Sequence, residues 1–270
     1  MPEDLRIFST RSQHLPAYPL VAATLFLLLV PLPAATQFLY TPTAFRPGEV
    51  LTYKVKWSFI RLGTITVRQE YPDADFPLYF QVWLNGESAV GLPFIDVFFR
   101  STSLLNRESP TNVLYELMTD RDDPVRTAYI YDPSNHRMIA LGTQAGEVSR
   151  LDTLAAPVPY YDGPGLYMFT RCASGSDTTL QLPTVMDYNL GLTSIRFVRT
   201  VEMVEVAAFE GEVPAYPFMG STDWEGSSFA GMSGSFRGWV STDSSRIVLK
   251  AEVKIFLGSA VIELESVSMQ

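Results

Sequence analysis

The feature that most constrains the fold is a pair of alternating stretches between residues 51 and 69. In Leu51–Trp57, apolar and aromatic side chains alternate with threonine and lysine. Successive side chains of a β-strand point to opposite faces of the sheet, so this alternation predicts a strand with one buried face. A break near Gly63 separates it from a second alternating stretch, 64–69. Two such stretches joined by a short break predict a β-hairpin.

Similar stretches recur along the rest of the chain and predict an all-β fold. We expect strands at 78–84, 97–105, 113–119, 126–131 and 138–143, and shorter ones at 178–182 and 187–190 on either side of a break at Pro183. Residues 195–207 form a long β-branched run. Near the C-terminus, 246–255 and 260–265 alternate on either side of Gly258, which predicts a half-exposed antiparallel hairpin.

One helix is expected in the middle of the chain. Residues Gly165–Cys172 are the best helix candidate after the N-terminal segment, and they follow a proline-rich stretch. No repeat of fixed period and no clear linker divides residues 37–270, so we expect a single β-rich domain. The predicted architecture is a mainly antiparallel curled sheet or half-barrel with one or two short helices.

The first 36 residues have the composition of an export signal. The apolar run Leu20–Val30 is too short to span a bilayer comfortably, which takes about 20 residues. The small residues Ala34, Ala35 and Thr36 follow it, so we expect a signal peptide at 1–36 that is cleaved near this point. The alternative is an uncleaved N-terminal anchor. In either case we expect the chain in the periplasm or the cell envelope, with no further transmembrane segment.

The acidic composition limits the partners that the chain can bind. Its net charge of −9 repels phosphate backbones, so we expect no nucleic-acid partner. The single cysteine, Cys172, excludes an intrachain disulfide, and stability must come from burial of the 47% of residues that are apolar. Because Cys172 lies in the expected helix, we interpret it as a buried apolar side chain rather than a nucleophile.

Three segments, spread over nearly all of residues 37–270, carry a resemblance to a known family. They are Phe45–Tyr53 with Trp57 and Gly63, then Tyr160–Arg171, and finally Trp239–Arg246 with Gly258–Ser259 beyond it. Their order and spacing resemble the DUF3108 family of exported bacterial proteins of unknown function. The resemblance implies an envelope-associated, β-rich fold, comparable in outline to lipoprotein-carrier half-barrels, and it implies no catalytic residues. Ile247 departs from the family pattern, in which a proline commonly occupies this place.

Histidine-based chemistry is not expected. His136 is the only histidine after the N-terminal segment, and it lies in a stretch with turn composition, so we expect a solvated turn residue. We expect no metal and no cofactor, and we assign no catalytic residue. Paired carboxylates leave an envelope hydrolase as an alternative. The candidates are Asp162, Asp187, Asp223, Glu225 and Asp243, of which Asp162 and Asp243 lie in contexts typical of backbone capping.

Aromatic side chains carry the remaining functional signal. If the first strands pair, one face of the sheet could carry Tyr53, Trp57, Tyr79 and Trp83. Trp239 is a further candidate for a ligand-binding residue. These residues either fill the core or line a cavity for an apolar or lipid-like ligand. We expect a non-enzymatic protein that binds such a ligand or an envelope component. The alternative is an assembly protein that acts through its sheet edges or the stretch 220–238.

Overall fold

The computed structural model describes residues 41–71, 78–92, 96–107, 111–223, 234–255 and 258–270. All of them belong to one compact unit, Phe38–Gln270. The predicted signal peptide, residues 1–36, lies outside the described residues. Within the described part, no helix has the length and apolar character needed to cross a membrane.

The strands of the described part form one antiparallel sheet, which confirms the predicted all-β class. The first half of the chain supplies β1 (Glu49–Trp57), β2 (Ile60–Glu70), β3 (Tyr79–Ser88), β4 (Phe98–Asn106), β5 (Asn112–Thr119), β6 (Val125–Asp132), β7 (Arg137–Gln144) and β8 (Glu147–Ala155). The second half supplies β9 (Thr179–Met186), β10 (Asn189–Phe197), β11 (Glu202–Glu205), β12 (Glu212–Thr222), β13 (Ser235–Ser241), β14 (Val248–Ile255) and β15 (Gly258–Met269). The helical segments are η1 (Pro42–Ala44), η2 (Pro133–Asn135) and α1 (Gly163–Ala173), so the predicted helix is confirmed.

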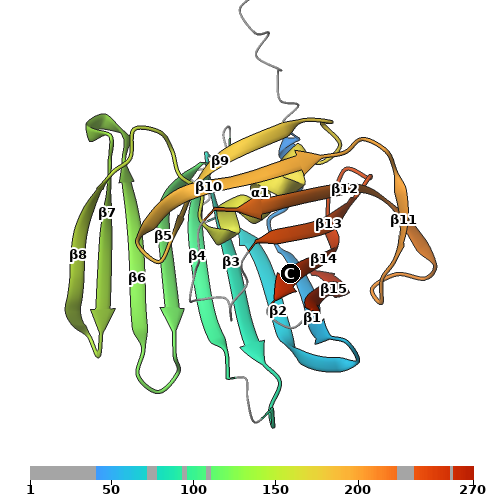
Figure 1. The fold of residues 1–270 in the computed structure, drawn as a ribbon, viewed down its shortest axis with the longest axis horizontal. Helices are drawn as coiled ribbons and strands as arrows, with labels where there is room; N and C mark the ends of the chain where they lie inside the picture. The colour runs from blue at the N-terminus through green and yellow to red at the C-terminus, as the bar shows by residue number, and fades with distance from the viewer. Residues whose placement is uncertain (1–40, 72–77, 93–95, 108–110, 224–233, 256–257) are drawn as a thin grey trace, which may run out of the picture. The chain divides into compact units, whose positions relative to one another are not determined.

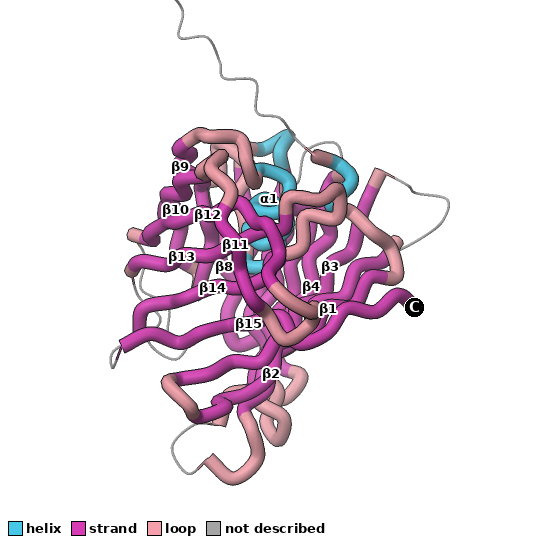
Figure 2. The backbone as a smooth tube through the Cα atoms, turned by 90° about the vertical axis from the view of Figure 1, so that its right-hand side faces the viewer, coloured by secondary structure: helices cyan, strands magenta, loops and turns pink. Residues whose placement is uncertain are grey.

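The first and last strands of the chain are neighbours within the sheet. The strand order is β8–β7–β6–β5–β4–β3–β2–β1–β15–β14–β13–β12–β10–β9, and β11 also pairs with β12. In the described part β8 and β9 do not pair with each other, so the sheet is not closed. Figure 1 shows β1–β8 as a curved row in blue to green, with the later strands in yellow to red folded across it. In the side view of Figure 2, α1 lies between the two halves of this curled sheet.

Helix α1 fits inside the curl because two of its faces are apolar. Met168 and Cys172 lie one turn apart and belong to a core cluster that includes side chains of β1–β4. Phe169 and Ala173 belong to a second cluster, with side chains of β9, β10 and β12–β14. The helix therefore fills the space between the two halves of the sheet. Cys172 is fully buried, as predicted.

The β9–β10 hairpin packs across β6 and β7 through Tyr188. Asp187 and Tyr188 both have positive φ (47° and 63°), as in a two-residue type I′ turn. The backbone N–H of Tyr188 donates to the hydroxyl of Tyr129 at 3.0 Å. The Arg150 guanidinium lies 4.0 Å from the centre of the Tyr188 ring. Gly142 leaves the necessary room, because a Cβ there would lie 2.4 Å from the Tyr188 hydroxyl oxygen. This contact joins the two ends of the sheet without pairing their edges.

Prolines account for two of the errors in the predicted strands, at β9 and β12. The predicted break at Pro183 is wrong, because β9 continues through this residue. The Pro183 carbonyl accepts from the backbone N–H of Tyr161 at the outer edge of the sheet (2.8 Å). Since the N–H and C=O of a strand residue point the same way, the missing N–H also faces this edge, where the ladder does not need it. Strand β12, which contains Pro214 and Pro217, and strand β8 were not predicted.

A fully buried ion pair ties α1 to the start of the sheet. The carboxylate of Glu49 accepts from both terminal nitrogens of Arg171, at 2.6 and 3.2 Å, and both side chains are 0% exposed. Gln69 Nε2 also donates to this carboxylate, at 2.5 Å. Two further Arg171 hydrogens are donated to the backbone carbonyls of Ser245 (2.7 Å) and Arg246 (2.8 Å). The three segments that carry the family resemblance therefore meet at one buried charge pair.

Removing either charge of this pair should destabilise the fold strongly. Arg171→Met leaves the buried Glu49 carboxylate with only the partly exposed Arg46, at 3.3 Å, as a counter-ion and should lower the free energy of unfolding by about 3–5 kcal/mol. Glu49→Gln should cost a similar amount, and the double variant should cost less than the sum because the two changes remove one shared interaction. Urea unfolding measures these differences.

The exposed pair Arg61–Glu265 provides the control, with side chains 47% and 34% exposed. Arg61→Met should cost less than about 1 kcal/mol, because water screens an exposed pair. Similar losses for Arg61→Met and Arg171→Met would contradict the structural role of the buried pair.

Candidate functional site

The aromatic residues predicted to share a face lie on both faces of the sheet. Tyr53 of β1 is directly opposite Ile65 of β2, which is opposite Gly86 of β3. Directly opposite residues share a face, so Tyr53 and Gly86 both belong to the inner face. Tyr79 and Trp83 are odd-numbered positions of β3 and point outward. The predicted shared face is therefore wrong, because the register between β1 and β3 places these side chains on opposite sides.

Tyr53 and Trp239 are both buried members of one core cluster, but they lie on opposite faces of the sheet. The Tyr53 hydroxyl lies 2.9 Å from that of Tyr167 in α1, and burial raises the pKa of Tyr167 to about 12. Trp239 is opposite Lys250 on the outer face, and its indole N–H donates to Glu202 at 2.6 Å. Tyr53 therefore belongs to the core beneath the helix, whereas Trp239 is covered by the segment around β11.

An apolar cavity lies on the inner face, between α1 and the second half of the sheet. It has a volume of about 290 Å³. Its lining is almost wholly apolar and includes Leu166, Ile195, Phe218, Phe236, Val253 and Ile262. The hydroxyls of Thr170 and Thr193 also lie in the lining, but they bond to the Leu166 carbonyl and the Thr184 hydroxyl, each at 2.8 Å. We call this space the inner cavity.

None of the five predicted aromatic residues lines the inner cavity. Trp57 lies on the same face of the sheet, opposite Ala260, which is opposite Val253 of the lining. The lining residues come from α1 and from strands far apart in the chain. Sequence patterns mark many of them as apolar strand positions, but no local pattern shows that they surround one space.

Asp162, one of the candidate carboxylates, is buried at the start of α1. It accepts from the backbone N–H of Gly165 (2.8 Å), from the Ser103 hydroxyl (2.7 Å) and from the Asn112 side-chain amide. Burial raises the pKa of Asp162 to about 7, although the bonds from Gly165 and Ser103 act in the opposite direction. The predicted capping role is confirmed, since the carboxylate satisfies a free N–H of the first helical turn.

The other described candidate carboxylates lie in separate turns. Asp187 belongs to the β9–β10 turn, and Asp223 follows β12 and accepts from a backbone N–H of β10 at 2.6 Å. Asp243 accepts from the side chains of two neighbouring serines and from the backbone N–H of Arg246, and this last bond confirms its predicted capping context. Glu225 lies outside the described residues. The described candidates are thus held by local turn contacts rather than gathered in one cleft.

Two observations concern the other reactive side chains. His136 is exposed and ends η2 with a left-handed backbone (φ 50°), which agrees with the predicted turn position. In the parts of the chain that the structure describes, no three histidine, cysteine, aspartate or glutamate side chains form a group that could hold a metal ion.

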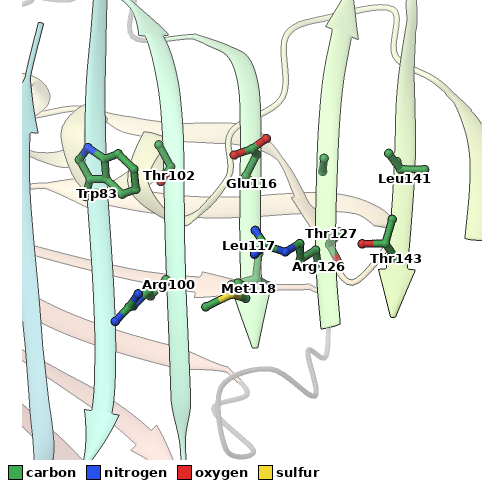
Figure 3. Close-up of a pocket in the computed structure, with 11 residues that line it drawn as sticks. Trp83, Arg100, Thr102, Glu116, Leu117, Met118, Arg126, Thr127, Leu141 and Thr143 are labelled. Atoms are coloured by element: carbon green, nitrogen blue, oxygen red, sulfur yellow. The ribbon is translucent and has the colours of Figure 1, made fainter. Parts of the chain in front are cut away.

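The outer face of β3–β7 carries a second depression, which we call the outer trough. It has a volume of about 450 Å³ and is lined by side chains from five adjacent strands. Figure 3 shows Trp83, Arg100, Glu116 and Arg126 among them. Arg100 and Arg126 are both opposite Met118 in register, so two arginines flank one residue of β5. The outer trough is thus more polar than the inner cavity.

A family match covers most of the sheet. Residues 52–265 match the model of a family described as a protein of unknown function, DUF3108. The chain belongs to the DUF3108 family. This confirms the resemblance seen in the sequence, and the match runs from β1 to β15. No curated protein matches the chain.

Three solved structures are similar to the chain at low sequence identity. A β-barrel-like protein of domain of unknown function DUF1849 from Brucella abortus is 8% identical, with a TM-score of 0.54, over 82% of this chain and 97% of that chain. A presumed exported protein with a YmcC-like fold from Bacteroides fragilis is 11% identical over 83% and 96%, with a TM-score of 0.38. A presumed lipoprotein from Parabacteroides distasonis is 10% identical over 85% and 99%, with a TM-score of 0.34. The first likeness supports the curled-sheet fold, and it does not extend to function.

Asp162 should make stability depend on pH. Its folded-state pKa of about 7 lies above the usual value of an unfolded aspartate, about 4, so the folded state binds the extra proton between these values. Its contribution to stability is complete below about pH 4 and is lost as the pH rises through about 7. Asp162→Asn resembles the neutral acid and can still cap the helix. It should therefore gain stability relative to wild type as the pH rises, by at most about 1.4 kcal/mol per pH unit.

Asp243→Asn is the matched control with the opposite sign. Burial acts to raise the pKa of Asp243, but the hydrogen bonds from Ser241 and Ser245 lower it below its usual value. Its contribution is therefore present above about pH 4 and lost as the pH falls. Urea unfolding across this pH range measures both differences. Parallel stability curves for wild type and Asp162→Asn would contradict the raised pKa.

Proposed function

We propose that this chain is an exported cell-envelope protein that binds the hydrocarbon part of a lipid-like molecule in the inner cavity and does not catalyse a reaction. The observation that carries the proposal is the apolar lining of a cavity of about 290 Å³ beside α1. Ligand sites are commonly concave and mostly apolar, with volumes from roughly 300 Å³ upward. The inner cavity is close to the lower end of this range, which suits a single hydrocarbon chain.

The chemistry of the lining favours hydrocarbon over a polar ligand. The two threonine hydroxyls with known partners, Thr170 and Thr193, already bond within the protein. A polar ligand would therefore lose its bonds to water without equivalent replacements, which is costly. Each methylene group that leaves water contributes about 0.8 kcal/mol to binding. The binding free energy of an acyl chain therefore becomes more favourable with each methylene group that the cavity accepts.

The proposed location rests on the N-terminal sequence. Residues 1–36 combine a short apolar run with small residues after it, as expected for a secretory signal peptide. A protein delivered to the envelope meets lipid-like molecules at high local abundance, which agrees with the proposed ligand class.

The two alternative roles have less support. Edge strand β8 carries the ion pair Arg150–Asp152 and a register shift opposite Gly142/Thr143, and both charges and bulges discourage pairing with another chain. Of the stretch 220–238, residues 224–233 lie outside the described part. A carboxylate hydrolase would require two acids in one cleft, whereas the described candidates lie in separate turns.

Filling the inner cavity should abolish ligand binding. Ala251 lies in the lining, on the inner face of β14, so Ala251→Phe places an aromatic ring in the cavity. We expect the affinity for cis-parinaric acid, a fluorescent fatty acid, to fall by about tenfold or more, which is about 1.4 kcal/mol. The increase in its fluorescence on binding measures the affinity.

Val261→Phe is the control, because Val261 is the neighbour of lining residue Ile262 and points to the outer face of β15. This variant should bind the probe as wild type does. Urea unfolding of both variants separates a filled cavity from a lost fold. A folded Ala251→Phe variant with unchanged affinity would overturn the proposed function.

A further inference from the structure

Two buried polar atoms beside the outer trough have no partner among the described residues. They are the indole N–H of Trp83 and the side-chain carbonyl of Asn85, which occupy neighbouring outward positions of β3. The Arg68 guanidinium lies over the Trp83 ring, 5.4 Å from a ring centroid, and so covers a face of the indole. Buried polar groups normally have a partner, because an unpaired one is costly. The outward side of β3 thus carries an unpaired donor and an unpaired acceptor next to the trough.

Two arginines of the same trough have no carboxylate partner in the described part of the chain. Nine other arginines there form ion pairs with aspartate or glutamate. Arg100 instead lies 5.3 Å from the centre of the Phe98 ring, and Arg126 makes no ion pair there. Two cations without a carboxylate partner form a local positive patch on this chain of net charge −9, and such a patch attracts an anion.

The strand register places these two cations at a suitable separation. Arg100 and Arg126 are both opposite Met118, so one strand lies between them. Neighbouring strands are about 4.8 Å apart, which puts the two backbones about 10 Å apart. Two long side chains can then reach the same group above Met118. The guanidinium fork matches the oxygens of phosphate or carboxylate.

The next row of the trough offers groups suited to hydroxyls. Trp83, Thr102 and Glu116 are successive neighbours in register on β3, β4 and β5. Thr102 and Glu116 present a hydroxyl and a carboxylate, which together donate to and accept from the hydroxyls of a sugar or glycerol. Trp83 turns the six-membered ring of its indole toward Thr102, and its buried N–H lies on the other side (Figure 3). The Glu116 carboxylate also repels a second anionic group at this end. The row with Arg100 and Arg126 therefore suits a single anionic group, and the row with Thr102 and Glu116 suits a neutral part of the ligand that carries hydroxyl groups.

We infer that the outer trough binds a ligand with one phosphate and several hydroxyls, which is the chemistry of a sugar phosphate and of a hydroxylated phospholipid headgroup. Arg100 and Arg126 bind the phosphate, and Thr102 and Glu116 contact the hydroxyls. The net negative charge of the chain disfavours a long polyanion such as nucleic acid. The outer trough lies on the opposite face of the sheet from the inner cavity, so this inference stands independently of the proposed function.

The first test is a titration with glucose 1-phosphate that follows the indole N–H signal of Trp83 in 15N–1H spectra, assigned with Trp83→Phe. We expect a saturable shift of this signal. Arg100→Gln and Arg126→Gln should each weaken the affinity by about tenfold or more, because each removes a charge-assisted hydrogen bond. Arg196→Gln is the control, since Arg196 is exposed on β10 and pairs with Asp177.

A second measurement distinguishes the two sources of this chemistry. A lipid headgroup is supported if the protein cosediments with vesicles of phosphatidylcholine and phosphatidylglycerol but not with vesicles of phosphatidylcholine alone. The Arg100→Gln/Arg126→Gln double variant should then lose this cosedimentation. Arginine-dependent binding of glucose 1-phosphate without such cosedimentation would support a soluble sugar phosphate. The inference is overturned if neither probe shows binding that depends on the two arginines. It is also overturned if inorganic phosphate binds as tightly as glucose 1-phosphate, because the hydroxyl contacts then contribute nothing.

Discussion

The curled sheet depends on one charged contact in its interior, between Glu49 and Arg171. Both groups lose their hydration on folding, and this loss is offset only when the two charges meet with their other hydrogen bonds complete. Gln69 and the backbone carbonyls of Ser245 and Arg246 supply further hydrogen bonds to the pair. Because these residues belong to β1, β2, α1 and the turn before β14, the pair fixes the helix against both halves of the sheet at once.

The position of the helix explains why the two faces of the sheet differ in chemistry. Met168 and Cys172 pack α1 in one core cluster with side chains of β1–β4, and Phe169 and Ala173 pack it in the other. The helix holds the two halves of the sheet apart, and the inner cavity lies in the space beside it. The outer face meets solvent and carries most of the charged side chains of β1–β7. The inner face therefore suits hydrocarbon, and the outer trough suits a hydroxylated anion.

Local patterns in the sequence predict the elements of this fold, but not their registers. The alternation in Leu51–Trp57 predicts β1 and its buried face, and the helix was expected where α1 lies. The side-chain period of a strand is two, so an offset of one residue between strands moves every side chain to the opposite face. For this reason Tyr79 and Trp83 were predicted on the same face as Tyr53, whereas they lie on the other. Pro183 was expected to end a strand because the position of a strand at a sheet edge is not visible locally. The inner cavity and the Arg171 contact join residues far apart in the chain, which no local pattern records.

Native mass spectrometry of the protein purified from the cell envelope tests most directly whether the helix and the curled sheet together form a binding site for hydrocarbon. The predicted result is a folded protein that carries one small molecule per chain, which organic solvent extracts and which contains a hydrocarbon chain. A protein that carries no such molecule, and that takes none up when incubated with an extract of envelope lipids, would contradict this function.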